Sequence, residues 1–252
     1  MIDYLKAILA ANSVEEVWSV HLSDMKRYGI DRLLYGMTSN IGSDGIGSPK
    51  DLLLLSNHKP EYIEPFIYRR MYDHGPMVRW ASRNTGACSW NWVRERIELL
   101  SEEEHKVIEF NRARGVTVGY TISFPMMMSG RRSAIGLSVD EGMTQDELDA
   151  HWEKVGEEIE VKNTIMNLKL LSLPFTLNGE RLTTRQREVL EWVGMGKTTQ
   201  ETSELMNVSA ATIEKHLRLA REQLDVETSA QAVLKAALQN QIFLVTPDSE
   251  LP

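Results

Sequence analysis

Four stretches with helical spacing of their apolar residues follow one another in the C-terminal third of the chain. The third stretch carries the clearest stripe, with Ile213, Leu217, Ala220 and Leu224 at the i, i+4, i+7, i+11 positions of one helical face. Asn207 supplies a turn just before it. The pattern predicts a four-helix unit whose second and third helices form a helix-turn-helix.

Capping signatures indicate where these and other helices begin. A Ser or Thr followed three residues later by Glu or Gln lets the two side chains bond the free N–H groups of a first helical turn. In the C-terminal third this signature stands at Thr183, Thr198 and Thr228, and Ser209 is an N-cap without it. The same signature predicts helices that start after residues 13, 101 and 144.

The N-terminal two thirds of the chain mixes helical and alternating patterns. Residues 29–40, 115–126 and 133–142 alternate as strands, with a hairpin turn at 129–133, whereas residues 60–71 have helical spacing. A long helix over residues 146–171 carries the apolar stripe Leu148, Trp152, Val155, Ile159 and Ile165. The glycine-rich segment 40–51 has neither the spacing of a phosphate loop nor that of a dinucleotide fingerprint, so we expect a loop there.

Together these elements predict an α+β protein of two domains. Residues 1–172 are expected to form an α/β/α sandwich, with an antiparallel sheet between helices and an apolar pocket. Residues 173–180, interrupted by Pro174, Asn178 and Gly179, form a linker, and residues 181–246 form an all-α domain of four helices. A chain of 252 residues is long enough for each domain to bury its own core.

The face of the third C-terminal helix opposite its apolar stripe is short and cationic. It carries Ala211, Lys215, Arg218 and Glu222, and it is flanked by Glu214 and Arg221. Such a face fits the major groove of DNA. A four-helix bundle with a purely structural role would show the same amphipathic helices, so the pattern alone leaves both interpretations open.

The charge of the chain changes this picture once it is divided between the domains. A net charge of −8 and an isoelectric point near 5.4 argue against a DNA-binding protein. However, residues 180–246 hold eight Lys/Arg and nine Asp/Glu, whereas residues 1–179 hold twenty and twenty-five. The acid therefore lies mainly outside the predicted DNA-binding domain. Its cations supply phosphate and base contacts whose affinity falls steeply with salt.

Several other function classes have no support in the sequence. The lone cysteine, Cys88, excludes a disulfide framework and a Cys-rich zinc site, and the six histidines lack metal-ligand spacing. No G-x-S-x-G nucleophile elbow is present, so we expect neither an enzyme nor a resident cofactor. No apolar run is long enough for a membrane span and the N-terminus lacks a cleavable leader, so we expect a cytoplasmic protein.

The motifs LTTRQREVL, GMGKTTQE and NVSAATIEKHL, in this order between residues 182 and 217, resemble the DNA-binding domain of LuxR-type regulators. Landmarks of that family fall on Leu190, Gly196 and the T-x-x-x-H-L run that ends at Leu217. The chain departs from the family at Gln186, usually glutamate, and at Thr202-Ser203, usually Ile-Ala. The DNA contacts we expect are Lys197, Thr198, Thr212, Glu214, Lys215, Arg218 and Arg221.

An aromatic segment in the N-terminal part resembles the autoinducer-binding domain of the same family. When Pro76-Met77-Val78 is set on the family's D-P-x-V, Trp90 falls on its strand tryptophan, and Tyr62 and Phe66 fall on two aromatic positions of the preceding helix. Gly119 then falls on a pocket glycine that leaves room for a ligand, and Ser138 falls where a hydroxyl often points at the ligand. Without the resemblance, such an aromatic cluster is usually a core and a strand glycine usually eases packing.

The same register puts Gly75 where the family has the aspartate that accepts the amide N–H of an acyl-homoserine lactone. A buried amide donor left without an acceptor costs about 1–3 kcal/mol. Asp73 is two residues away and would reach a ligand only along a different backbone path, and Phe66 lacks the hydroxyl of the family's tyrosine. The candidate ligand-binding residues are Tyr62, Phe66, Asp73, Gly75, Pro76, Trp90, Gly119 and Ser138.

The resemblance implies a sequence-specific transcriptional regulator that binds double-stranded DNA, is controlled by a small signal such as an acyl-homoserine lactone, and has RNA polymerase as a further partner. We expect a homodimer, because one short recognition helix buries little surface and paired half-sites raise both affinity and specificity. Three alternatives stay open: a ligand-independent relative whose first domain serves dimerisation or protein binding, a response regulator, and a small-molecule-binding enzyme.

Overall fold

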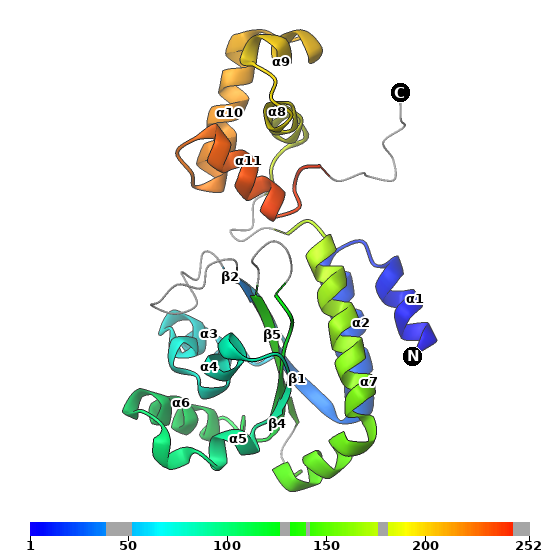
Figure 1. Ribbon diagram of the computed structural model, residues 1–252, viewed down its shortest axis with the longest axis vertical. Coiled ribbons are helices and arrows are strands. Elements are labelled where there is room, and N and C mark those ends of the chain that lie inside the picture. Colours follow the sequence, from blue (N-terminus) through cyan, green and yellow to red (C-terminus); the bar gives the residue numbers. More distant parts are fainter. Residues whose placement is uncertain (39–51, 127–131, 140–141, 176–180, 244–252) are drawn as a thin grey trace. The chain divides into compact units, whose positions relative to one another are not determined.

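The computed structural model describes residues 1–38, 52–126, 132–139, 142–175 and 181–243. The chain divides into two compact units, Met1–Leu171 and Ser172–Pro252. Figure 1 shows a sheet with helices on both faces in the first unit and a bundle of helices in the second. The predicted glycine-rich loop and hairpin turn fall wholly or largely outside the described residues.

The first unit is built on a five-stranded antiparallel sheet with the strand order β2-β1-β5-β4-β3. Its strands are β1 (Ile30–Thr38), β2 (Leu52–Ser56), β3 (Gly86–Ser89), β4 (Gly119–Ser123) and β5 (Arg132–Val139). The predicted strands correspond to β1, β4 and β5, of which β4 is shorter than the alternation suggested. The strand β2 was not among the predicted elements.

Helices cover both faces of this sheet, as the α/β/α prediction requires (Figure 1). One face carries α1 (Ile2–Ala10), α2 (Val14–Met25) and α7 (Gln145–Ser172). The other carries α3 (Pro60–Tyr68), α4 (Pro76–Arg83), α5 (Asn91–Arg94) and α6 (Glu102–Arg112). Short 3₁₀ turns follow some of these helices: η1 (Lys26–Tyr28), η3 (Met71–His74) and η4 (Ile97–Leu99).

The predicted caps form. The side chain of Ser13 accepts the Glu16 N–H at 3.1 Å, and Ser101 and Glu104 close a full capping box at the start of α6. Thr144 and Glu147 bond each other just before the first turn of α7. These caps satisfy backbone N–H groups that a helix start leaves free, which explains why short sequence signatures located the helices.

The inward face of α7 is more polar than its predicted stripe. Leu148 and Ile159 are buried as expected, but Trp152, Val155 and Ile165 are only half-buried, and Lys162, Asn163 and Asn167 are fully buried instead. The polar groups have partners on other elements. Lys162 Nζ lies 2.6 Å from Asp24 Oδ2 on α2, and Asn163 Oδ1 lies 3.0 Å from His21 Nε2. The stripe prediction was therefore wrong at Trp152, Val155 and Ile165, because partners distant in sequence decide which residues of α7 are buried.

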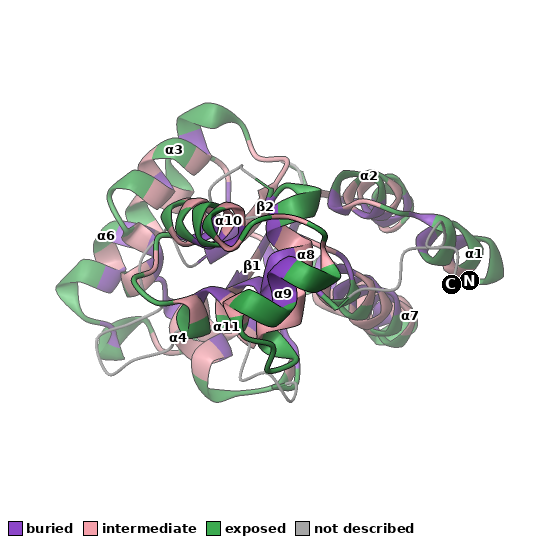
Figure 2. Ribbon diagram, turned by 90° about the horizontal axis from the view of Figure 1, so that it is seen from above, coloured by how far each residue is buried: buried purple, intermediate pink, exposed green. Residues whose placement is uncertain are grey.

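The second unit contains the four predicted helices, α8 (Thr184–Gly194), α9 (Thr199–Leu205), α10 (Ala210–Leu224) and α11 (Ser229–Leu238). Their caps are Thr183, Thr198, Ser209 and Thr228, as predicted. Asn207 turns the chain between α9 and α10 with a φ of 52°. Figure 2 shows the buried and exposed faces of α10, and its buried stripe is the predicted one.

Part of the predicted linker belongs to the second unit. Leu173 and Phe175 are both buried there. The Phe175 N–H donates to the Gln239 carbonyl oxygen at 3.1 Å, and Asn240 Nδ2 donates to the Leu173 carbonyl oxygen at 3.0 Å. Residues 176–180 lie outside the described residues.

Candidate ligand cavity and DNA-binding surface

A cavity of about 610 Å³ lies in the first unit between the sheet and the helices α3, α4 and α6. The sheet makes room for it with small residues. On the cavity side of the central strands, Gly36 pairs with Ala134 and Thr121 pairs with Gly136, and all four residues line the cavity. The opposite side of the same strands carries large buried side chains: Leu33, Tyr35, Ile135, Leu137 and Ile122. The asymmetry between the two faces explains why one side of the sheet is filled and the other is hollow.

The helices contribute an aromatic wall. Tyr62 and Phe66 stack with their ring centroids 5.5 Å apart, and His58 stacks on Tyr62 at 4.5 Å. The Tyr62 hydroxyl donates to Asn111 Oδ1 at 3.1 Å. Burial, together with the charge of Arg32, lowers the pKa of His58 to about 4, so this ring is neutral near pH 7. The predicted residues Tyr62 and Phe66 therefore line the cavity, as do Gly75 and Pro76.

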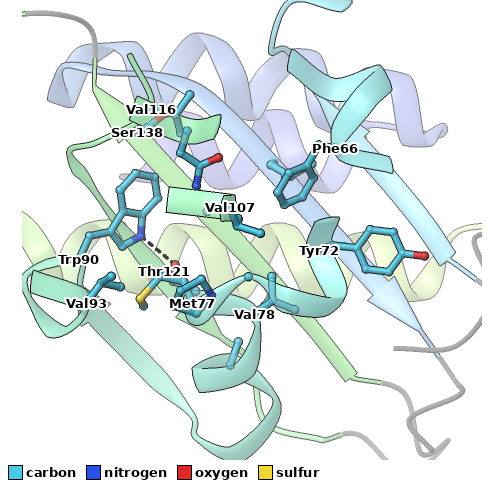
Figure 3. Close-up of a pocket in the computed structure, with 18 of the residues that line it drawn as sticks. Phe66, Tyr72, Met77, Val78, Trp90, Val93, Val107, Val116, Thr121 and Ser138 are labelled. Carbon is cyan, nitrogen blue, oxygen red and sulfur yellow. Dashed lines mark hydrogen bonds between the residues drawn. The ribbon is translucent and has the colours of Figure 1, made fainter. Parts of the chain in front are cut away.

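Trp90 forms the other end of the group of lining residues (Figure 3). It stands directly after β3 rather than on the strand, because the ladder with β4 ends at Ser89. The Trp90 indole N–H donates to Thr121 Oγ1 at 2.9 Å, as the dashed line in Figure 3 shows. Its hydrogen-bonding capacity is used within the protein, so the ring offers the cavity an apolar surface.

Gly119 serves the packing of Trp90 and does not line the cavity. A Cβ atom at Gly119 would lie 2.2 Å from the Leu137 carbonyl oxygen and 3.0 Å from the Trp90 ring. The expectation that this glycine leaves room for a ligand is corrected accordingly: the room is occupied by Trp90. The interpretation that a strand glycine eases tight packing describes this position.

Two further candidates occupy different places. Asp73 is outside the cavity lining, and its Oδ2 accepts the Arg70 Nε–H at 2.7 Å. The backbone therefore does not bring Asp73 to the cavity, and the alternative that Asp73 contacts a ligand has no support here. Ser138 lines the cavity, but its hydroxyl donates to the Arg32 carbonyl oxygen at 3.3 Å.

Sequence reasoning missed most of the other lining residues, and four of them carry polar groups beside the aromatic wall or Trp90: His58, Tyr72, Asn111 and Gln145. Gln145 binds both backbone groups of Gly119, accepting its N–H at 2.9 Å and donating to its carbonyl oxygen at 3.1 Å. None of the four carries a local motif, although Tyr72 belongs to the aromatic cluster that the sequence shows. No group of three His, Cys, Asp or Glu side chains within the described ranges is placed to hold a metal ion.

Cys88 lies on β3 and is half-buried. Burial raises the pKa of its thiol to about 11, so the thiol is protonated near pH 7. A protonated, partly buried thiol is a weak nucleophile. The residue therefore fits a packing role in the sheet.

The second candidate site is the outer face of α10. Lys215 and Arg218 are exposed, and Arg218 pairs with Glu222 at 2.6 Å. Glu214 accepts a hydrogen bond from the Thr199 hydroxyl at 2.9 Å, which joins α9 to the side of α10. Arg221 is half-buried and donates to Ser229 Oγ at 2.9 Å, so its guanidinium is engaged at the start of α11.

The remaining predicted contacts lie at the N-terminal ends of the two helices. Lys197 and Thr198 are exposed at the start of α9, and the Thr198 hydroxyl caps that helix. Thr212 is half-buried, and its hydroxyl lies 2.9 Å from that of Ser209. Thr202 and Ser203, the polar departures in α9, are both buried, and the Thr202 hydroxyl has no hydrogen-bond partner among the described residues. The helix-turn-helix therefore buries two polar residues, Thr202 and Ser203, where the resemblance led us to expect Ile-Ala.

This chain combines a sheet domain that contains a cavity with a helix-turn-helix domain. The combination is that of transcriptional regulators with a sensory domain. Residues 13–170 match the autoinducer binding domain, and residues 180–236 match the bacterial regulatory proteins of the luxR family. The chain belongs to the LuxR-type transcriptional regulators that combine these two domains. The resemblance stated from the sequence is confirmed.

Individual relatives agree with this assignment. The chain is 22% identical to the transcriptional activator protein AnoR of Acinetobacter nosocomialis over 236 residues, which cover 94% of this chain and 96% of AnoR. The solved structure of CepR2, an N-acylhomoserine lactone dependent factor from Burkholderia cenocepacia, matches with a TM-score of 0.54 and 12% identity over 67% of this chain and 93% of that one. SdiA in complex with octanoyl-rac-glycerol matches with a TM-score of 0.50 and 16% identity over 93% and 92%. At these identities the two structures support the fold.

None of the described helices combines the length and apolar character needed to cross a bilayer.

Proposed function

We propose that the protein is a cytoplasmic LuxR-type regulator whose binding to double-stranded DNA is controlled by a small apolar signal held in the cavity of its first unit. The observation that supports this proposal is the 610 Å³ cavity itself. Its volume falls in the range of small-molecule pockets, and its lining is mostly apolar and aromatic. The acyl-homoserine lactones expected from the resemblance are the first ligands to test.

A ligand that binds only the folded state stabilises it by RT ln(1 + [L]/Kd), about 2.7 kcal/mol at a hundredfold excess over Kd. For a unit of this size, that gain corresponds to a rise in melting temperature of about 5–11 °C. Thermal melts of the full chain with and without N-acyl-homoserine lactones of several chain lengths measure the shift. A melting temperature that none of them changes would remove this signal class.

The DNA half of the proposal rests on the exposed cations of α10. We expect Arg218→Ala to weaken binding to the specific site by about 1–3 kcal/mol. Arg185 is a matched control, because it is also an exposed arginine in an ion pair within one helix, Arg185–Glu188 at 2.7 Å, but lies on α8. Fluorescence anisotropy with specific and random duplexes separates the roles: equal losses on both duplexes would mean that Arg218 contacts phosphate alone.

Pairing of two copies is proposed through the outward side of α7. Val161 and Leu168 are 43% and 45% exposed there, and Trp152, Val161 and Ile165 line a shallow groove. An apolar surface on a long helix fits a second copy of itself about a twofold axis. Val161→Glu should yield monomers in light scattering, whereas Arg83→Glu, at the exposed end of α4 on the opposite face of the sheet, should leave the dimer intact. Dimers from both variants would place the interface elsewhere.

A second candidate is a ligand-independent regulator whose first unit serves dimerisation or protein binding. The glycine at position 75 favours it, since the family's polar anchor is missing there. Native mass spectrometry of protein purified from its own host distinguishes the two functions. A bound small molecule supports ligand control, and an empty protein that binds its DNA site at full strength supports the alternative. RNA polymerase contacts are proposed in both cases.

A further inference from the structure

A carboxylate stands among the cations on the outer face of α10. Glu214 is exposed together with Lys215 and Arg218, and Glu214 and Arg218 are four residues apart, so they are neighbours on one helical face. A carboxylate on a surface that approaches DNA is repelled by the phosphate groups. A favourable role for Glu214 in DNA binding therefore requires a hydrogen-bond donor on the bases.

The carboxylate of Glu214 is not used up within the protein. Nearby acids have structural partners: Glu201 closes the capping box of α9, and Glu222 pairs with Arg218 at 2.6 Å. Glu214 forms no ion pair with any residue in the described part of the chain. Its side chain accepts one hydrogen bond there, from the Thr199 hydroxyl to Oε1 at 2.9 Å. The second oxygen, Oε2, remains available to a partner outside the protein.

The bond from Thr199 holds the carboxylate in place. Thr199 is the first residue of α9 and is half-buried, so its hydroxyl is carried by the first helix of the helix-turn-helix. Because this hydroxyl donates to Oε1, one edge of the Glu214 carboxylate is fixed against α9. A side chain that is ordered before binding loses less conformational entropy on binding. The arrangement therefore favours a contact of defined geometry.

The chemistry of the base edges decides what such a carboxylate accepts from. In the major groove cytosine presents the N4 amino donor, guanine presents two acceptors, thymine presents an acceptor and a methyl group, and adenine places the N7 acceptor beside its amino group. A group that only accepts hydrogen bonds therefore matches cytosine best. Glu214 lies in the second turn of α10, and the N-terminal residues of a recognition helix are the ones that contact base edges.

We infer that Glu214 selects a cytosine in each half-site, with Oε2 accepting a hydrogen bond from the cytosine N4 amino group, and that Thr199 positions the carboxylate for this contact. The inference rests on the proposed DNA-binding function and names one base of the recognised sequence. A contact between a carboxylate and a base releases no counterion from the phosphates, so it adds specificity rather than general affinity.

The test selects duplexes from a library with the full chain purified from its own host and then sequences them. About 20 randomised base pairs span two half-sites one helical turn apart. The unaltered chain should enrich a half-site with a position at which C is favoured. Glu214→Ala should lower that preference about 5- to 150-fold, which corresponds to the about 1–3 kcal/mol of one mismatched base pair.

Glu214→Gln separates the base contact from a purely structural role. Its amide oxygen still accepts the Thr199 hydroxyl, but the new amide group also donates, so the preference at that position should change from C to A. Unchanged base preferences in both Glu214 variants overturn the inference and leave DNA binding standing. A library from which the unaltered chain enriches no sequence overturns the proposed function and the inference with it.

Two further variants serve as controls. Glu204 is matched to Glu214, because it is exposed on α9 and its Oε1 accepts the Gln200 Nε2–H at 3.0 Å. Glu204→Gln removes the same charge and should leave every base preference unchanged, whereas a shift like that of Glu214→Gln would assign the effect to charge alone and overturn the base contact.

The positioning role of Thr199 has its own test. Thr199→Val should weaken the preference for C at least twofold without changing the favoured base, because the carboxylate remains but is no longer held. Thr199→Ser keeps the hydroxyl and should restore the preference. A Thr199→Val chain with the preference of the unaltered chain overturns this role.

Discussion

Replacing Lys162 should destabilise the first unit more than any surface change, because it strands a buried carboxylate. Lys162 is 1% exposed, and its Nζ lies 2.6 Å from Asp24 Oδ2 and 2.7 Å from the Tyr28 hydroxyl. Burial acts to lower the pKa of Lys162, but the hydrogen bonds that its ammonium donates to Asp24 and Tyr28 outweigh it and leave the pKa raised. The ammonium is therefore charged in the folded protein and ties α7 to α2 and η1.

The expected size follows from what remains after Lys162→Met. Among the residues that the structure describes, Asp24 would keep only Arg27, whose side chain is 73% exposed and whose guanidinium lies 3.3 Å away. Removing one member of a buried pair costs about 3–5 kcal/mol, whereas replacing both members by apolar residues is often close to neutral. We expect Lys162→Met to cost about 3–5 kcal/mol and Lys162→Met/Asp24→Leu to cost less than about 2 kcal/mol.

The assay is urea unfolding followed by tryptophan fluorescence. Five of the six tryptophans, Trp18, Trp80, Trp90, Trp92 and Trp152, lie in the first unit, so the signal reports mainly on it. Asp24→Leu alone completes a double-mutant cycle. A double variant whose loss equals the sum of the two single losses would show that the pair is not coupled, and would refute the reasoning.

Three further outcomes are expected. Burial lowers the pKa of His21 to about 4, below its unfolded value of about 6.5, so stability is fully present above pH 6.5 and falls toward pH 4; His21→Gln should flatten that slope in urea titrations. Gly119→Ala should lower the free energy of unfolding by at least about 1–3 kcal/mol, because its Cβ would lie 2.2 Å from the Leu137 carbonyl oxygen. Gly136→Ala, whose Cβ would make ordinary contacts at 3.9 Å, should cost less in the same urea titrations. Ser209→Ala should cost about 1 kcal/mol through the lost cap of α10, and Ser209→Asp should retain it.

The second unit could be predicted almost completely from the sequence, because its determinants are local. A cap and the glutamate or glutamine three residues later fix the starts of α8, α9 and α11 within a single turn, and Ser209 alone caps α10. Asn207 adopts its positive φ within one loop. The stripe from Ile213 to Leu224 is buried by neighbours within the same short unit. Such signals need no knowledge of distant segments.

The first unit was predicted only in outline, because its decisive contacts span the chain. Lys162 and Asp24 are 138 residues apart, and no local pattern distinguishes this buried lysine from an exposed one. The cavity likewise depends on strand register: Gly36 comes opposite Ala134 only once β1 and β5 are paired. Small residues at alternate strand positions, at 134 and 136, were the available signal for a hollow face.

The cavity and the proposed pairing surface meet on one helix. Gln145, the first residue of α7, lines the cavity and holds both backbone groups of Gly119. Farther along α7, Asn167 accepts hydrogen bonds from Ser133 of β5 at 2.7 Å and from Tyr35 of β1 at 2.9 Å, on the sheet face opposite the cavity. Because sheet and helix share these bonds, we expect a ligand that shifts β1 or β5 to shift α7 as well. Any coupling is reciprocal: a signal that tightens pairing tenfold must itself bind the paired form tenfold more tightly.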